Sequence, residues 1–168
     1  MGSKLENYLL KLNIIGYMKK ATFAAGCFWH VEEVFSKTPG VKSTQVGYTG
    51  GNVVNPTYEQ VCTDRTGHAE AIEVEYEPEE ISYKELLKVF FENHNPTTAN
   101  RQGPDVGIQY RSAIFYHDSE QEELAKEVKD NLNPIAKEKF GNEIVTEIKS
   151  VVPFYRAEEY HQKYFQKY

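Results

Sequence analysis

The order of predicted strands and helices favours an α+β fold: a two-layer α/β sandwich with a ferredoxin-like core and a mixed or antiparallel sheet. Short segments with alternating apolar residues are separated by segments in which apolar residues recur with helical spacing. Along the chain these segments follow the order βα-ββ-αβ-αβ. The length of 168 residues is typical of one domain, so a single sheet with helices packed on it is expected to form the core.

Five segments are expected to be strands, because they alternate or form short apolar runs bounded by glycine, proline or polar residues. They are residues 20–25, 41–48, 69–76, 108–116 and 144–148. The alternation is clearest in residues 69–76, which makes this strand the best defined of the five.

Helices are expected between these strands, where apolar residues recur three or four positions apart. They are residues 27–37, 82–94 and 119–141, followed by an aromatic helical tail from residue 153. Ser82-x-x-Glu85 and Ser119-x-x-Glu122 have the spacing of capping boxes, so each is expected to open a helix. Pro134 is expected to interrupt the third helix, because proline removes a backbone donor.

Two segments fall outside this pattern. Residues 1–17 are expected to be a helical extension, with Ser3-x-x-Glu6 as its capping box and Gly16 at its end, before one domain over residues 18–168. Residues 95–107 are expected to be a loop, with two prolines and two glycines. Loops of this length inside a compact domain are usually functional.

Composition excludes several classes of protein. The net charge of -6 disfavours a nucleic-acid or anionic-membrane partner. No apolar run is long enough to span a bilayer, and the first residues lack the apolar core of a secretory signal. Two cysteines are too few for a disulfide scaffold, so free thiols in the cytoplasm are expected. The cysteines and histidines have no zinc-site spacing, so no metal is expected.

Cys27 is the sharpest candidate for a reactive residue. A strand of small residues runs into Gly26, and Cys27 then opens a helix. The unpaired N–H groups at a helix N-terminus stabilise a thiolate. A fall in thiol pKa from about 8.5 to about 7 would raise the thiolate fraction at neutral pH to about half. The alternative is a small buried residue, which is a common fate of a free cysteine.

Glu70 shares a face of its strand with apolar residues. The strand period places Glu70, Ile72, Val74 and Tyr76 on one face, while Glu73 lies on the other. Burial would raise the pKa of the Glu70 carboxyl and keep it protonated near neutrality, as a general acid requires. The alternative is that Glu70 has already reached solvent at the end of the strand.

Two tyrosines, Tyr58 and Tyr110, are hydroxyl donors on expected strands. Among 12 tyrosines neither is distinguished by its own pattern. On their pattern alone, packing at the edge of the core is the favoured interpretation of both.

Several motifs taken together resemble the A-type peptide methionine sulfoxide reductases, over about residues 20–165. They occur in the family's order. The motifs are Gly26-Cys27-Phe28-Trp29, Val46-Gly47-Tyr48-Thr49-Gly50-Gly51, Asn55-Pro56-Thr57-Tyr58, Thr66-Gly67-His68-Ala69-Glu70-Ala71, Phe90-Phe91-Glu92-Asn93-His94, Arg101-Gln102-Gly103-Pro104-Asp105-Val106-Gly107, Gln109-Tyr110-Arg111-Ser112 and Pro153-Phe154-Tyr155.

The resemblance implies reduction of methionine-S-sulfoxide, free or in oxidised proteins, with a role for each matching residue. Cys27 would attack the sulfoxide sulfur and become a sulfenic acid, while Glu70 protonates the oxygen. The remaining roles are carried over from the family. Tyr58 and Tyr110 would donate hydrogen bonds to the oxygen, Phe28 and Trp29 would form an apolar socket for the methyl group, and Asp105 would hold the substrate's backbone amide.

The resemblance also implies that no cofactor is bound and that an external thiol regenerates the enzyme. Thioredoxin, glutaredoxin or a small thiol would reduce the sulfenic acid, and a monomer is expected. Many relatives carry recycling cysteines in a C-terminal tail beyond the motif matched by His161-Gln162-Lys163-Tyr164, and this chain has no cysteine there. Cys62 is the alternative resolving residue, although a structural thiol is the simpler interpretation. His30 stands where the family more often has glycine, and a helix-surface histidine is expected.

Two other classes of function fit part of the pattern. A Cys–His hydrolase could pair Cys27 with His68, His94 or His161, but Glu70 would then have no role. A module that binds methionine or its sulfoxide without turnover would not need both Cys27 and Glu70. The pair therefore favours the reductase.

Overall fold

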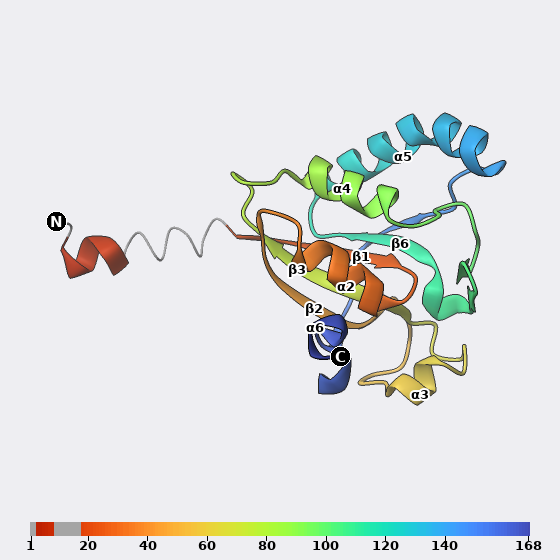
Figure 1. Cartoon of the computed structure of the whole chain (residues 1–168), viewed down its shortest axis with the longest axis horizontal. Coiled ribbons are helices and arrows are strands. Elements are labelled where there is room, and N and C mark those ends of the chain that lie inside the picture. Colours follow the sequence, from red (N-terminus) through yellow and green to blue (C-terminus); the bar gives the residue numbers. More distant parts are fainter. Residues whose placement is uncertain (1–2, 9–17) are drawn as a thin grey trace.

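The computed structural model describes residues 3–8 and 18–168 (Figure 1). The predicted capping box is present in the first of these ranges: Ser3 Oγ accepts the Glu6 N–H at 3.1 Å, and Glu6 Oε2 accepts the Ser3 N–H at 2.6 Å. The rest of the predicted extension, including Gly16, lies outside the described residues. The division of the chain between extension and domain stays a prediction.

Six of the described strands form one sheet in the order β7-β6-β1-β3-β2-β8. The strands are β1 (Lys19–Ala25), β2 (Val41–Thr49), β3 (Ala69–Tyr76), β6 (Ser112–Tyr116), β7 (Glu147–Ser150) and β8 (Tyr155–Arg156). β3 lies between β1 and β2 and is antiparallel to both, and β6 is antiparallel to β1. This is the predicted ferredoxin-like core, and the parallel pairing of β7 with β6 makes the sheet mixed.

Helices α2 (Phe28–Ser36), α4 (Tyr83–Glu92) and α5 (Ser119–Phe140) form the second layer (Figure 1). Their apolar faces share one core with the inward residues of the sheet. Phe23 of β1 lies at its centre, with its ring stacked on Phe35 of α2 at 5.2 Å and on Phe90 of α4 at 5.1 Å between centroids. The predicted two-layer architecture is therefore confirmed.

The opposite face of the sheet carries small side chains. A second cluster there consists of Ala24, Ala69, Ala71, Ala113 and Phe115, with Phe154 packed against it. At Gly47 of β2, an added Cβ would lie 2.4 Å from the Tyr155 carbonyl oxygen and 2.6 Å from the Phe154 ring. Only a residue without a side chain permits this close approach of the C-terminal segment to β2.

The prediction of a strand over 108–116 is wrong for its first residues, since β6 begins only at Ser112. Gly107, with φ of 145°, is followed by the 3-10 helix η1 (Ile108–Tyr110), in which the Tyr110 N–H donates to the Gly107 carbonyl at 3.0 Å. Tyr58 is not on a strand either, because Thr57 caps the short helix α3 (Tyr58–Val61). Both tyrosines thus follow turns that alternation does not reveal.

The third predicted helix differs in its start and in its continuity. Asp118, not Ser119, caps α5, accepting the Gln121 N–H at 2.8 Å. The helix also continues through Pro134. Pro134 and Asp130, whose carbonyl would have been its hydrogen-bond partner, are both exposed, so water can replace the lost bond.

The C-terminal part also departs from the expected pattern. The strand β7 begins only at Glu147, because the Ile144 N–H donates to Asn133 Oδ1 and the Val145 N–H to the Pro96 carbonyl, each at 2.8 Å. The tail is helical only in part. It comprises β8, the 3-10 helix η2 (Glu159–His161) and the short helix α6 (Tyr164–Lys167).

No helix in residues 3–8 or 18–168 combines the length and apolarity that crossing a bilayer requires.

A buried histidine joins α4 to the sheet. His94 Nδ1 donates to the Phe90 carbonyl at 2.7 Å, which leaves Nε2 to accept the Ser112 hydroxyl at 2.8 Å. Ser112 Oγ is in turn 2.8 Å from Thr146 Oγ1. Burial lowers the pKa of His94 to about 4, although the bond to Phe90 opposes this shift.

Stability should therefore fall as the pH drops from about 6.5 to about 4. In this window His94 is protonated in the unfolded chain but neutral in the folded protein, so acid favours unfolding. This group alone should lower the free energy of unfolding by up to roughly 3 kcal/mol. Urea unfolding at several pH values measures the slope. A His94→Gln variant should show a shallower dependence of the free energy of unfolding on pH. The control His30→Gln, at an exposed position, should keep the parental dependence. Equal slopes in all three proteins would contradict the assignment.

Candidate active site

Cys27 lies at the junction between β1 and α2, as predicted. It precedes the first residue of α2, and its carbonyl accepts the His30 N–H at 3.2 Å. Gly26 before it has φ of +89°, and an added Cβ would lie 2.8 Å from the Gln102 side chain. Glycine therefore permits both the turn and the close approach of the 95–107 loop to the thiol.

The Cys27 thiol is half-buried, and its pKa is raised to about 11. Burial is the main cause, and the carboxylates of Glu70 and Asp105 raise the pKa further. The N–H groups of Trp29 and His30 lower it, as expected at a helix N-terminus, but desolvation outweighs them. The expectation of a lowered thiol pKa is therefore wrong for the free protein, and the thiol is neutral at pH 7.

Glu70 is buried at the N-terminal end of β3 with 2 % of its surface exposed. Its strand neighbours Ile72 and Val74 belong to the main core, which confirms the predicted face. Glu70 Oε1 accepts the N–H of Phe28 at 3.2 Å, so the carboxyl lies beside the residue that follows Cys27.

Burial raises the pKa of Glu70 to about 8, with a further contribution from the Asp105 carboxylate. The hydrogen bond from Phe28 favours the charged form but does not compensate for the lost hydration. At pH 7 about nine carboxyls in ten are protonated. The site therefore combines a neutral thiol with a neutral carboxylic acid.

Tyr58 and Tyr110 lie within electrostatic reach of this carboxyl. Burial raises the pKa of Tyr110 to about 12, and the charge of Glu70 is the next largest cause. Burial also raises the pKa of Tyr58, with contributions from the neighbouring Cys62 thiol, from Tyr110 and from Glu70. Both phenols are therefore protonated donors near Glu70 at neutral pH.

Asp105 lies in the hairpin of β4 (Arg101–Gln102) and β5 (Asp105–Val106), inside the predicted loop. It is half-buried, and its charge raises the pKa of both Cys27 and Glu70. The loop is anchored at its start by Gln102, which donates to the Asn95 carbonyl at 2.8 Å. The hairpin thus brings a carboxylate to the site.

Phe28 and Trp29 occupy different environments. Phe28 is 1 % exposed, and its ring lies 5.7 Å from Tyr48 between centroids. Trp29 is half-buried, stacks on Tyr164 at 3.7 Å and donates its indole N–H to His161 Nδ1 at 2.9 Å. Trp29 therefore has the more accessible apolar surface.

His161 and Tyr164 were missed as site residues from sequence. The motif His161-Gln162-Lys163-Tyr164 indicates where the family resemblance ends, and nothing in its local pattern predicts a contact with Trp29. A histidine and a tyrosine three residues apart on a short helical tail are typical of ordinary aromatic packing.

Cys62 is free and exposed and directly follows α3. The Tyr58 hydroxyl beside it favours the thiolate, but burial is the larger effect and raises the Cys62 pKa. His30 is exposed on α2 with its ring 5.0 Å from Phe165, as expected of a surface histidine.

The three histidines of the alternative hydrolase are bonded elsewhere. His68 accepts the Gly51 N–H and donates to the Val53 carbonyl, while His94 bonds Phe90 and Ser112. His161 accepts from Trp29, and its buried Nε2 has no partner among the described residues. None of their bonds involves Cys27, so the described part of the chain contains no Cys–His dyad. The same part has no group of three His, Cys, Asp or Glu side chains placed to hold a metal ion.

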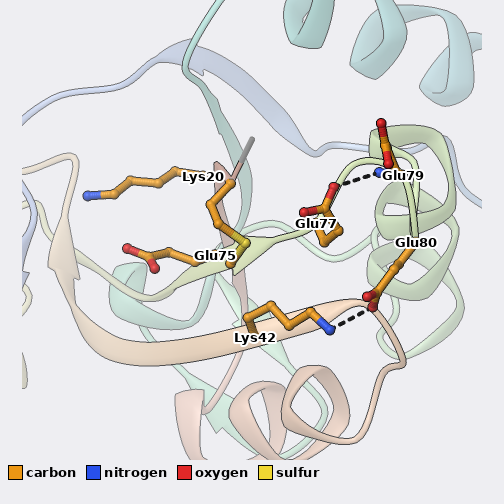
Figure 2. A pocket seen from close by; sticks show the side chains of 7 residues that line it. Lys20, Lys42, Glu75, Glu77, Glu79 and Glu80 are labelled. Atoms are coloured by element: carbon orange, nitrogen blue, oxygen red, sulfur yellow. Dashed lines mark hydrogen bonds and ion pairs between the residues drawn. The ribbon is translucent and has the colours of Figure 1, made fainter. Parts of the chain in front are cut away.

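A solvent-open pocket of about 810 Å³ lies away from these residues (Figure 2). It is lined by Met18, Lys20, Lys42, Glu75, Glu77, Glu79 and Glu80. Lys42 pairs with Glu80 at 2.7 Å, and Glu77 accepts the Glu79 N–H at 3.1 Å. Two of its charged groups, Lys42 and Glu80, pair with each other, and no candidate catalytic residue lines it.

Comparison with known proteins points to one family. Residues 19–168 match the model of the family described as peptide methionine sulfoxide reductase. The peptide methionine sulfoxide reductase MsrA of Methanosarcina acetivorans is 58% identical over 150 residues, which are 89% of this chain and 79% of that protein. The protein of the same name from Methanothermobacter thermautotrophicus is 56% identical over 149 residues, covering 89% and 87%.

Solved structures agree with this match. Methionine sulfoxide reductase A of Corynebacterium diphtheriae has a TM-score of 0.86 at 37% identity, covering 90% of this chain and 75% of that one. The reduced form of Mxr1 from Saccharomyces cerevisiae has a TM-score of 0.84 at 38% identity, covering 90% and 86%. Mxr1 in complex with Trx2 has a TM-score of 0.62 at 28% identity, covering 89% and 86%.

The thiol of the free protein should titrate with a pKa of about 11. In a Cys62→Ser background Cys27 is the only cysteine, so the pH dependence of its alkylation by iodoacetamide, read as covalent mass added, reports this group without interference from the 12 tyrosines. Adding Glu70→Gln should lower the pKa, because it removes the negative charge that opposes the thiolate. A parental pKa at or below about 8.5 would contradict the dominance of burial.

Proposed function

The chain belongs to the peptide methionine sulfoxide reductase family, and we propose that it reduces methionine-S-sulfoxide to methionine through Cys27 and Glu70. One observation carries this mechanism: a buried, neutral carboxyl accepts the N–H of the residue next to the thiol. A sulfoxide oxygen leaves poorly unless it is protonated. A carboxylic acid that retains its proton at pH 7 supplies that proton, and such catalysis is typically worth about 10²–10⁴-fold.

The proposed step transfers oxygen from the substrate to Cys27. The Cys27 sulfur attacks the sulfoxide sulfur while Glu70 donates its proton to the oxygen. The carboxylate formed next to Cys27 takes up the thiol proton, so Glu70 ends neutral. The protonated oxygen then leaves the substrate sulfur as a hydroxyl group and bonds to the Cys27 sulfur, while the transient bond between the two sulfurs breaks. The methionine side chain is thereby reduced by two electrons, and Cys27 is oxidised to the sulfenic acid.

The remaining residues are proposed to bind the substrate. Tyr58 and Tyr110 donate hydrogen bonds to the oxygen as charge develops on it. Phe28 and Trp29 form an apolar socket for the methyl group. Asp105 accepts the backbone N–H of the methionine sulfoxide residue. A free amino acid and a protein segment both present these groups, so both are proposed substrates.

Regeneration is proposed to use an external thiol. Mxr1 has been solved in complex with Trx2, which supports a thioredoxin as the reductant of this chain. Glutaredoxin or a small thiol is the alternative. Cys62 is exposed and lies beside Tyr58, and it is the alternative resolving residue. Thiol-dependent turnover fits a reducing compartment, and we place the protein in the cytoplasm as a monomer.

The purified protein should consume the S epimer of an N-blocked methionine sulfoxide and leave the R epimer. Cys27→Ser should abolish the reaction, because no other residue provides the nucleophile. Cys62→Ser is the matched control and should keep both the first turnover and steady-state turnover with thioredoxin. No loss of the S epimer, or full activity in Cys27→Ser, would overturn the proposal; loss of only steady-state turnover in Cys62→Ser would make Cys62 the resolving residue.

The rate of the reductase step should be flat up to about pH 8 and then fall about tenfold per pH unit. The reacting form has both the thiol and Glu70 protonated, and Glu70 loses its proton first because its pKa is lower than that of Cys27. Single-turnover measurements of methionine formation test this profile. Glu70→Gln should be slower by about 10²–10³-fold and lack the fall at pH 8. A parental rate that rises to pH 8 and then levels would show that the thiolate must form before attack.

A further inference from the structure

Glu158, in the C-terminal segment, contacts two residues near the site that are 110 and 100 positions away from it in sequence. Its Oε1 accepts the hydroxyl of Tyr48 at 3.0 Å, and its Oε2 accepts the backbone N–H of Tyr58 at 3.1 Å. Tyr48 is a fully buried residue of β2, and Tyr58 is the first residue of α3. The side chain therefore ties the start of α3 to the sheet.

The chain on both sides of Glu158 is hydrogen-bonded to β2. The Ala157 N–H donates to the Val46 carbonyl at 3.0 Å. The buried Gln162 side chain accepts the Val46 N–H at 3.0 Å and donates to the Val46 carbonyl at 2.9 Å. Glu158 lies between these two attachments. Its carboxylate position is therefore defined by β2 and not by α3.

Tyr58 packs against the main core and its hydroxyl lies beside Cys62, but the bond to Glu158 is the one hydrogen bond from α3 to another element among the described residues. Tyr58 begins a helix of one turn, and its N–H has no partner inside that helix. The Tyr58 side chain is only half-buried, with its ring against His161 at 4.7 Å between centroids. A displacement of the start of α3 would therefore move the Tyr58 hydroxyl directly.

We propose that Glu158 is a positioning residue for the reductase reaction, acting by holding Tyr58 where its hydroxyl meets the sulfoxide oxygen. This inference rests on the proposed function, in which Tyr58 is a donor to that oxygen. The contact is needed most in the transition state, where negative charge on the oxygen is largest. Loss of the contact should lower kcat and leave KM nearly unchanged.

Three substitutions at two neighbouring positions separate geometry from charge. Glu158→Ala removes both acceptor oxygens and should lower kcat about tenfold. Glu158→Gln keeps an oxygen for the Tyr58 N–H and an amide group that can donate to the Tyr48 oxygen, so it should restore kcat to within about threefold. Glu159→Ala is the control at an exposed position and should leave kcat unchanged. Equal losses in Glu158→Ala and Glu158→Gln would show that the charge matters and would overturn the inference.

A double-mutant cycle with Tyr58→Phe tests the route of the effect. If Glu158 acts through the Tyr58 hydroxyl, Glu158→Ala should have almost no further effect on kcat in the Tyr58→Phe background. An undiminished loss there would overturn the inference. A Tyr58→Phe variant with parental kcat would overturn both this inference and the role of Tyr58, while Cys27→Ser tests the activity itself separately. Thermal unfolding checks that each variant is folded. If Glu158→Ala does not fold, Glu158→Asp replaces it, because the aspartate side chain is too short to reach both partners.

Discussion

The burial of one carboxyl group at the end of β3 is the constraint on which the site depends. Glu70 lies on the core face of the sheet, where the antiparallel pairing of β1 with β3 brings it to the start of α2. There it accepts the Phe28 N–H, which provides one compensating hydrogen bond for the lost hydration. Because one bond is not enough to keep the charge, the group remains an acid at neutral pH.

The same burial decides the state of the thiol. A helix N-terminus and a half-buried environment act on Cys27 in opposite directions, and desolvation is the stronger effect. The resting site thus contains two neutral hydrogen-bearing groups near one carboxylate, Asp105. In the proposed reaction the proton of Glu70 goes to the substrate oxygen. A neutral thiol also reacts more slowly than a thiolate with oxidants when no substrate is bound.

The C-terminal segment completes this arrangement from the other edge of the sheet. It pairs with β2, where the missing side chain of Gly47 leaves room for Phe154 and Tyr155. From this base it supplies His161 and Tyr164 to Trp29 and Glu158 to Tyr58. Trp29 and Tyr58, which touch the substrate in the proposed reaction, are therefore supported by residues 100 or more positions away in sequence.

Sequence by itself determined the α+β architecture, the strand–glycine–cysteine–helix junction at Cys27 and the apolar face that holds Glu70. These features follow from spacing within one segment, because side-chain direction in a strand or helix is set by the local backbone. The backbone around Tyr58 differs from the expected strand because of the capping box Thr57-x-x-Gln60, a local pattern that the sequence already contains. Tertiary structure alone decided the turn at Gly107 before Tyr110. It also decided the direction of the Cys27 pKa shift and the partners of Trp29. Burial and long-range contacts depend on which segments meet, and no local pattern contains that information.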